Sequence, residues 1–239
     1  MPVPTFASLL NDPTYVDLQI RCNGCVFKVH KVVVCTQVKF FAACMKWEFQ
    51  ELKSGIIFLE DDTPEVLELL IQFLYTGDYT VEIPEARDNE RVYRSNAELL
   101  VHAQIHTHAD KYLLDELRAL SISKFESALR NLAPVLFTEV FSTIMKGCPE
   151  KNEIFQTMCV DFAALHNKTL FTFRDYRNFC AENGAVCVRI MKVIADKVQY
   201  IKCSRCGVDI PGDLMAVVFT NVALALGLRG SVMAINEEL

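Results

Sequence analysis

No stretch of this sequence is long and apolar enough to cross a membrane. A bilayer-spanning helix needs roughly 18 or more consecutive apolar residues, and no run reaches that length. Residues 1–13 also lack the basic start and the long apolar segment of a secretory signal. We therefore expect an intracellular protein, cytoplasmic, nuclear or both, that has no membrane partner.

Positive charge is in short supply. The chain has 24 Lys and Arg against 30 Asp and Glu, which gives a formal net charge of -6. Proteins that bind nucleic acid through its phosphates need clustered Lys and Arg. The charge balance therefore argues against direct binding of nucleic acid.

Catalytic motifs are missing as well. The sequence has no glycine-rich loop of the kind that cradles phosphates and no Gly-x-Ser-x-Gly nucleophile elbow. Asp61 and Asp62 stand just before Thr63 and Pro64, where acids are expected at the start of a helix. The sequence therefore favours a protein that is not an enzyme.

Core-forming residues, by contrast, are plentiful. Of the 239 residues 51% are hydrophobic, enough for one large domain or two small ones. The ten cysteines come without a secretory signal. We interpret most of them as reduced thiols that serve as small apolar core residues.

Three short segments in the first half have the composition of β-strands. Residues 16–22 and 26–30 alternate apolar and polar side chains, and residues 56–59 are β-branched and aromatic. Asn23-Gly24 is a hairpin signal that predicts antiparallel pairing of the first two strands. Residues 32–34 continue the apolar run, and Thr36 is placed to cap the segment that follows.

Helical spacing marks the segments between and after these strands. Residues 40–47 carry Phe40, Phe41, Cys44 and Trp47 at that spacing. A helix is predicted to begin at Pro64, and Gly77 stands where a left-handed C-cap would end it. The apolar stripe of this helix consists of Val66, Leu69, Leu70, Phe73 and Leu74. Residues 81–96 are charged and predict a solvated insertion, after which Ser95 or Asn96 caps a further pair of helices.

Five motifs in register resemble the BTB/POZ domain, in its fungal kind: Asp17-Leu18-Gln19-Ile20, Phe27-Lys28-Val29-His30-Lys31, Phe40-Phe41, Phe73-Leu74-Tyr75-Thr76-Gly77-Asp78-Tyr79 and Ala109-Asp110-Lys111-Tyr112. The resemblance implies an α+β fold over residues 1–126, in which a β-sheet of three or more strands is flanked by helices. It also implies a protein–protein interaction module.

Two features of self-association are implied by the same resemblance. The apolar residues Phe6, Leu9 and Leu10 would belong to a leading helix that packs across a homodimer. Asp17 and Lys31 stand where BTB proteins of the transcription-factor type have a buried acid and base. The alternative is that both are ordinary solvated charges.

Phe49-Gln50-Glu51 matches the hydrophobic-x-Glu element of cullin-binding BTB domains. By resemblance, Phe49 would be an apolar anchor on a cullin-3 scaffold, and Glu51 would organise the loop or pair with a basic neighbour. Alternatively, Phe49 turns inward to cover Trp47 or Met45, and Glu51 is merely solvated.

The second half, residues 127–239, reads as an all-α extension. Apolar stripes of helical spacing alternate with breaks at Pro134, Pro149 and Gly184. One stripe is predicted on Ile154, Met158, Phe162 and Leu165. Residues 213–228 are apolar with few charges and need burial against this extension or in a partner.

Metal binding has two candidate sites. Cys203 and Cys206 form a Cys-x-x-Cys-Gly turn like one half of a zinc knuckle, but no Cys or His follows them to complete four ligands. A zinc site completed from afar, a redox dithiol and a purely structural turn remain open. His102, His106 and His108 share a predicted helix but lack a neighbouring acid for zinc chemistry. No other cofactor is expected.

Three functions of different class follow. The first is a self-associating adaptor that bridges a cullin-3 ubiquitin ligase to an unidentified substrate protein. The second is a BTB assembly or transcription scaffold without a ligase link. The third is a zinc- or thiol-dependent enzyme centred on Cys203 and Cys206.

Overall fold

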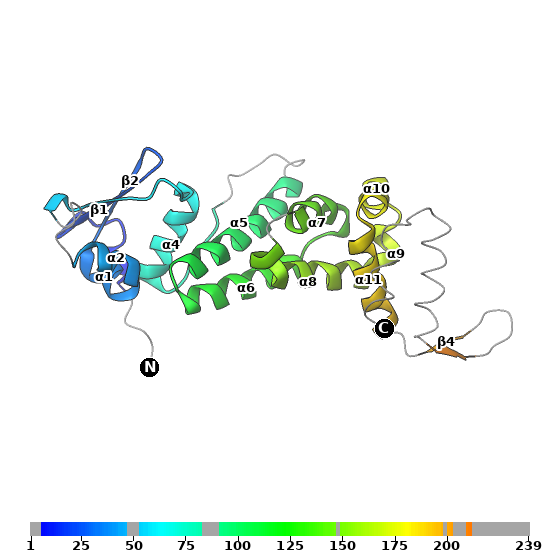
Figure 1. Cartoon of the computed structure of the whole chain (residues 1–239). Helices are drawn as coiled ribbons and strands as arrows, with labels where there is room; N and C mark the ends of the chain where they lie inside the picture. The colour runs from blue at the N-terminus through cyan, green and yellow to red at the C-terminus, as the bar shows by residue number, and fades with distance from the viewer. Residues whose placement is uncertain are drawn as a thin grey trace. The chain divides into compact units, whose positions relative to one another are not determined.

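The computed structural model describes residues 6–46, 53–82, 91–146, 149–197, 200–202 and 209–211. The chain divides into two compact units, Met1–Ala128 and Leu129–Leu239. Figure 1 shows the elements of both, with labels where there is room. No helix among the described residues is long and apolar enough to cross a membrane.

A three-stranded sheet forms one part of the first unit. Strand β1 (Leu18–Cys22) lies in the centre, antiparallel to β2 (Cys25–Val29) and parallel to β3 (Ile56–Phe58). Asn23 and Gly24 take positive φ values of 45° and 85°, as a two-residue hairpin turn requires. The predicted hairpin and the third strand are therefore confirmed.

Helices supply the rest of the first unit. They are the 3-10 helix η1 (Ala7–Leu9), α1 (Lys31–Gln37), α2 (Lys39–Cys44), α4 (Pro64–Thr76), α5 (Arg91–Lys111) and α6 (Asp115–Arg130). Gly77 ends α4 with a left-handed φ of 77°, and its N–H donates to the carbonyl of Phe73 at 2.8 Å. The predicted α4 and its cap are confirmed.

Residues 31–37, which contain the apolar run after the predicted strand, form a helix. Val32, Val33 and Val34 belong to helix α1, although β-branched residues favour strands. Val33 and Val34 are completely buried in the core, and that packing outweighs their propensity. Thr36 does not cap the next segment, because its hydroxyl donates back to the carbonyls of Val32 and Val33 inside the same helix.

The predicted insertion is shorter than expected. Residues 91–96 already form the first turns of α5, so neither Ser95 nor Asn96 is an N-cap. Residues 83–90 lie outside the described part of the chain.

The described part of the second unit is mainly helical, as predicted. Its helices are η3 (Pro134–Leu136), α7 (Phe137–Lys146), α8 (Pro149–Leu165), α9 (Asn167–Leu170), α10 (Arg174–Glu182) and α11 (Gly184–Lys197). Aromatic side chains fill its core: the ring centroid of Phe137 lies 4.8 Å from that of Phe141 and 4.7 Å from that of Phe162.

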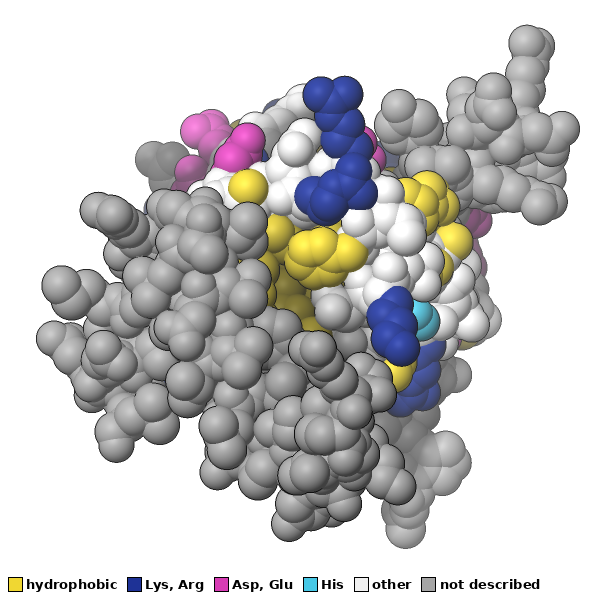
Figure 2. Space-filling view, turned by 90° about the vertical axis from the view of Figure 1, so that its right-hand side faces the viewer, with side chains coloured by type: hydrophobic (Ala, Val, Ile, Leu, Met, Phe, Trp, Pro, Cys, Tyr) yellow, Lys and Arg dark blue, Asp and Glu magenta, His cyan; other side chains and the backbone are white. Residues whose placement is uncertain are grey.

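Two details of this unit differ from the prediction. An antiparallel ribbon of β4 (Tyr200–Lys202) and β5 (Asp209–Pro211) adds strands to an extension predicted to be all helical. On α8 the buried apolar residues are Phe155, Cys159, Val160, Phe162 and Ala163, whereas Ile154 and Leu165 are exposed. Hydrophobic side chains also reach the surface on the face seen in Figure 2. Residues 213–228 lie outside the described residues.

Candidate interaction surfaces

The leading segment places its apolar residues on the first unit's own core. Phe6, Leu9 and Leu10 are partly buried and pack against the core cluster, while Ala7 and Ser8 of η1 are exposed. The three side chains therefore keep part of their apolar surface in solvent within a single chain. Their use in a dimer remains a prediction.

Asp17 and Lys31 do not form a buried charge pair within the chain. Asp17 is exposed, and its carboxylate accepts a 2.7 Å hydrogen bond from the backbone N–H of Lys31, the first residue of α1. A carboxylate at this position satisfies a free N–H group and complements the helix dipole. Asp17 thus fixes the start of α1 rather than neutralising a buried ammonium.

Asp62 is the buried acid of this unit. Its side chain is only 1% exposed, and the carboxylate lies 2.8 Å from the Lys111 ammonium and 3.1 Å from Nε2 of His108. The hydroxyl of Tyr112 donates a short hydrogen bond to the other carboxylate oxygen. Burial raises the pKa of Asp62, but the bonds from His108, Lys111 and Tyr112 outweigh it and hold that pKa well below its usual value.

The backbone carbonyl of Asp62 is also hydrogen-bonded. Its carbonyl accepts from Asn23 Nδ2 at 2.8 Å and from the Cys22 thiol at 3.1 Å. Asp62 therefore joins the β1–β2 hairpin to the end of α5. The sequence suggested only a helix-start acid, although two of its partners belong to the motif Ala109-Asp110-Lys111-Tyr112 that carried the resemblance.

The histidines are held by protein groups rather than arranged for a metal. His102 Nδ1 lies 2.9 Å from the Tyr79 hydroxyl, and burial lowers the pKa of His102 to about 4, with Lys124 adding to the effect. His30 bonds the Tyr75 hydroxyl and the Thr14 carbonyl, each at 2.8 Å, as expected for a satisfied buried histidine. No group of three or more His, Cys, Asp or Glu suited to a metal occurs among the described residues.

Helix α2 and the α5–α6 junction each expose a large apolar residue next to Tyr112, Phe40 through ring contact and Leu113 through the chain. Phe40 on α2 is 45% exposed and packs edge-on against the buried ring of Tyr112, with centroids 5.7 Å apart. The next residue, Leu113, is 70% exposed and has a strained φ of 56°. We call Phe40 and Leu113 the α2 surface. Its residues carried no role in the sequence-based prediction of a cullin site.

Four predicted site residues lie outside the described part of the chain. They are Phe49 and Glu51 of the cullin-binding motif and Cys203 and Cys206 of the Cys-x-x-Cys turn. Their roles remain predictions from the sequence.

Comparison with known proteins gives a consistent assignment for the first half. The family model described as BTB/POZ domain matches residues 6–119. Human Zinc finger and BTB domain-containing protein 41 is 35% identical over 75 residues, covering 30% of this chain and 8% of that protein.

Two other relatives match about a third of the chain. Zinc finger protein chinmo of Drosophila melanogaster is 31% identical over 80 residues, covering 32% of this chain and 13% of that protein. Human Kelch repeat and BTB domain-containing protein 4 is 25% identical over 79 residues, covering 33% and 15%. The chain thus spans only a small part of the length of these relatives.

Proposed function

Because residues 6–119 make this chain a BTB/POZ domain protein, we propose that it is an adaptor that self-associates and binds a cullin-3 scaffold. The BTB domain is a protein–protein interaction module. In the proposed adaptor the first unit engages the scaffold, and the second unit holds a substrate protein.

One observation carries the scaffold half of this proposal. The α2 surface exposes Phe40 and Leu113 on a domain whose other large apolar side chains are mostly buried. Exposed apolar side chains beside ordered elements suit a partner interface, in which a few central anchors supply most of the binding energy.

The sequence supports the same location. Helix α2 ends at Cys44, and Phe49-Gln50-Glu51 follows a few residues later. This is the hydrophobic-x-Glu element that the BTB resemblance associates with cullin binding. In this proposal Phe49 is an apolar anchor on the scaffold.

Self-association is proposed through Phe6, Leu9 and Leu10. These partly buried side chains already pack on the core, so a second copy would cover only their remaining apolar surface. Two-fold dimers are the commonest protein assemblies.

A scaffold without a ligase link is the second candidate. It is favoured by two relatives whose names include zinc fingers, because they are more identical to this chain than the Kelch repeat relative is. In this candidate function the protein self-associates but does not bind a cullin.

Capture of the protein by an immobilised cullin-3 N-terminal region separates the two candidates. We expect capture of the wild type and strong loss with Leu113→Gly. Glycine accepts the positive φ of Leu113, so this change removes the side chain with little effect on folding.

Tyr15→Gly is the matched control. Tyr15 is 86% exposed and also has a positive φ, of 63°. Its replacement should leave capture unchanged. No capture of the wild type would favour the scaffold without a ligase link, and equal capture of wild type and Leu113→Gly would remove the α2 surface from the interface.

A further inference from the structure

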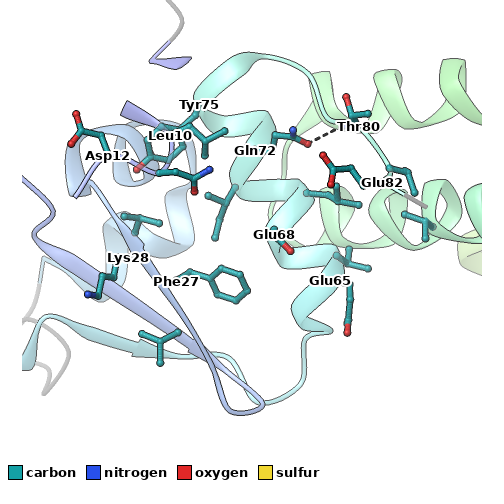
Figure 3. Close-up of a pocket in the computed structure, with 18 of the residues that line it drawn as sticks. Leu10, Asp12, Phe27, Lys28, Glu65, Glu68, Gln72, Tyr75, Thr80 and Glu82 are labelled. Atoms are coloured by element: carbon teal, nitrogen blue, oxygen red, sulfur yellow. Dashed lines mark hydrogen bonds between the residues drawn. The ribbon is translucent and has the colours of Figure 1, made fainter. Parts of the chain in front are cut away.

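A groove in the first unit runs between the outer strand of the sheet and helix α4. It encloses about 850 Å³ and is lined by β2, by the exposed side of α4 and by the segments around Asp12 and Glu82. Figure 3 shows Phe27 directed from β2 into this space, while Lys28 points away from it. The groove uses neither Phe40 nor Leu113.

Strand β2 offers unpaired backbone groups to this groove. The N–H of Gln19 donates to the carbonyl of Gly55, and the carbonyl of Arg21 accepts from the N–H of Leu59, so both residues direct their backbone groups toward β3. In an antiparallel pair, the residues opposite them direct their groups toward the other edge.

The residues opposite are Lys28 and Val26. Their N–H and C=O groups therefore face outward, and no hydrogen bond to them occurs within the part of the chain that the structure describes. A strand edge of this kind is a template for pairing with another extended chain. Val26 is also 51% exposed, so the edge is not covered by its own side chains.

The rim of the groove is acidic. Glu65 and Glu68 lie one turn apart on α4, both exposed, and Glu82 and Asp12 add two more carboxylates. Figure 3 labels Glu65, Glu68 and Glu82 among the residues that line the groove. Among the described residues that line the groove, Lys28 is the one Lys or Arg. A ligand that fits must therefore carry positive charge.

The floor of the groove is apolar. Phe27, Leu69 and Val101 line it and pack on the core of the unit while remaining partly exposed. Such a floor can receive the aliphatic stems of Lys or Arg as well as apolar side chains, since these stems lie readily along apolar surface.

From these three features we propose that the groove binds an extended segment of a partner protein in which Lys or Arg alternates with apolar residues. The segment adds as a strand to the outer edge of β2. Its backbone pairs with Val26 and Lys28, and its cationic side chains reach Glu65 and Glu68. This surface is separate from the α2 surface and does not depend on cullin binding.

A labelled peptide of alternating lysine and valine is the probe, and fluorescence anisotropy with the full chain is the measurement. We expect saturable binding that weakens with added salt, and no comparable binding of a peptide of alternating glutamate and valine. Glu65→Lys with Glu68→Lys should weaken binding by roughly ten-fold or more, because it replaces attraction with repulsion at the rim.

Glu60→Lys with Glu116→Lys is the matched control. Both residues are exposed, neither lines the groove, and Glu116 lies in the first turn of its helix as Glu65 does. This pair makes the same change in net charge and should keep at least half of the wild-type affinity.

Lys28→Pro tests the strand addition. It removes an outward N–H that makes no bond to β1, and proline is tolerated at a strand edge. We expect loss of binding with Lys28→Pro and retained binding with Lys28→Ala, with circular dichroism of both variants matching the wild type. If Lys28→Pro unfolds the protein, Val26 N-methylation introduced by semisynthesis removes the equivalent donor and decides the point.

Four results would overturn the proposal. They are absence of peptide binding to the wild type, equal binding of the acidic peptide, wild-type affinity in the Glu65 and Glu68 variant, and wild-type affinity after loss of the outward N–H. A fall in the mass measured by light scattering for the Glu65 and Glu68 variant would instead assign the groove to a second copy of this chain.

Discussion

The ammonium of Lys111 lies 2.8 Å from the carboxylate of Asp62, a buried acid that stands 49 residues earlier in the chain. Three donors from the end of α5 converge on this one carboxylate. The contact joins the hairpin side of the sheet to the helix that carries Leu113 just beyond its end. The shape of the α2 surface therefore depends on Asp62.

Asp62→Asn should destabilise the first unit by about 2 kcal/mol or more. Removal of the Asp62 charge leaves the groups that bond to it without their ionic partner. The expected destabilisation is at the low end for a buried ion pair because Lys111 is partly exposed. Chemical denaturation at neutral pH measures it. Asp61→Asn, a change at the exposed neighbour, should alter the free energy of unfolding by no more than about 0.5 kcal/mol.

The same acid makes stability fall at low pH. The pKa of Asp62 is lower in the folded state than the unfolded value of about 3.9, so its contribution is present above about pH 4 and is lost as the pH falls further. The unfolding free energy of the wild type should therefore decline more steeply below pH 4 than that of Asp62→Asn. Parallel curves for the two proteins would show that the carboxylate has no depressed pKa.

His102 controls a separate pH range. Burial holds its pKa at about 4, below the unfolded value of about 6.5, so the unfolded state binds more protons between these values. Glu98 lies 3.7 Å away and favours the charged form, but it is partly exposed, and burial dominates. Stability should therefore fall as the pH drops from about 6.5 to 4, and His102→Gln should reduce that slope. A proton NMR titration that finds His102 charged at pH 6 would contradict this account.

The sequence predicted those elements whose conformation is determined by residues close together in the chain. The turn at Asn23 and Gly24 and the cap at Gly77 depend on backbone conformations that few residues adopt, so they could be read directly. The burial of Asp62 could not, because its partners lie about fifty residues away. The helix at Val33 and Val34 has a similar cause, because the core that buries these two residues is assembled from distant segments.

The site predictions followed the same division. Leu113 has a positive φ at the α5–α6 junction. Leucine rarely adopts this conformation, so the sequence did not predict it. The Asp17–Lys31 prediction came from resemblance, and within the chain the exposed Asp17 carboxylate accepts a hydrogen bond from the backbone N–H of Lys31.

Self-association should depend on the leading segment. Leu9→Asp with Leu10→Asp should convert a dimer to a monomer in size-exclusion chromatography with light scattering. Ala7→Asp with Ser8→Asp is the control, because both residues are exposed in the same turn. An unchanged dimer mass in the leucine variant, with its thermal melt retained, would exclude this surface.

Zinc content tests the Cys-x-x-Cys turn. If Cys203 and Cys206 form half of a completed site, protein purified without chelators should contain up to one zinc per chain, and Cys203→Ser should release it. Cys25→Ser, at an exposed thiol of the first unit, should not change the zinc content. Zinc-free wild-type protein would leave the turn with a structural role alone.

The most direct test of the adaptor proposal is the affinity of the cullin-3 N-terminal region for the wild type, Phe49→Ala and Glu48→Ala, measured by titration calorimetry. Truncation of a central aromatic anchor costs about 2 kcal/mol or more, roughly thirty-fold in affinity, whereas a rim charge costs much less. The account predicts that Phe49→Ala weakens binding at least that much, that Glu48→Ala stays near the wild type, and that thermal stability is unchanged in both. Equal affinity of wild type and Phe49→Ala, or no binding by either, would contradict it.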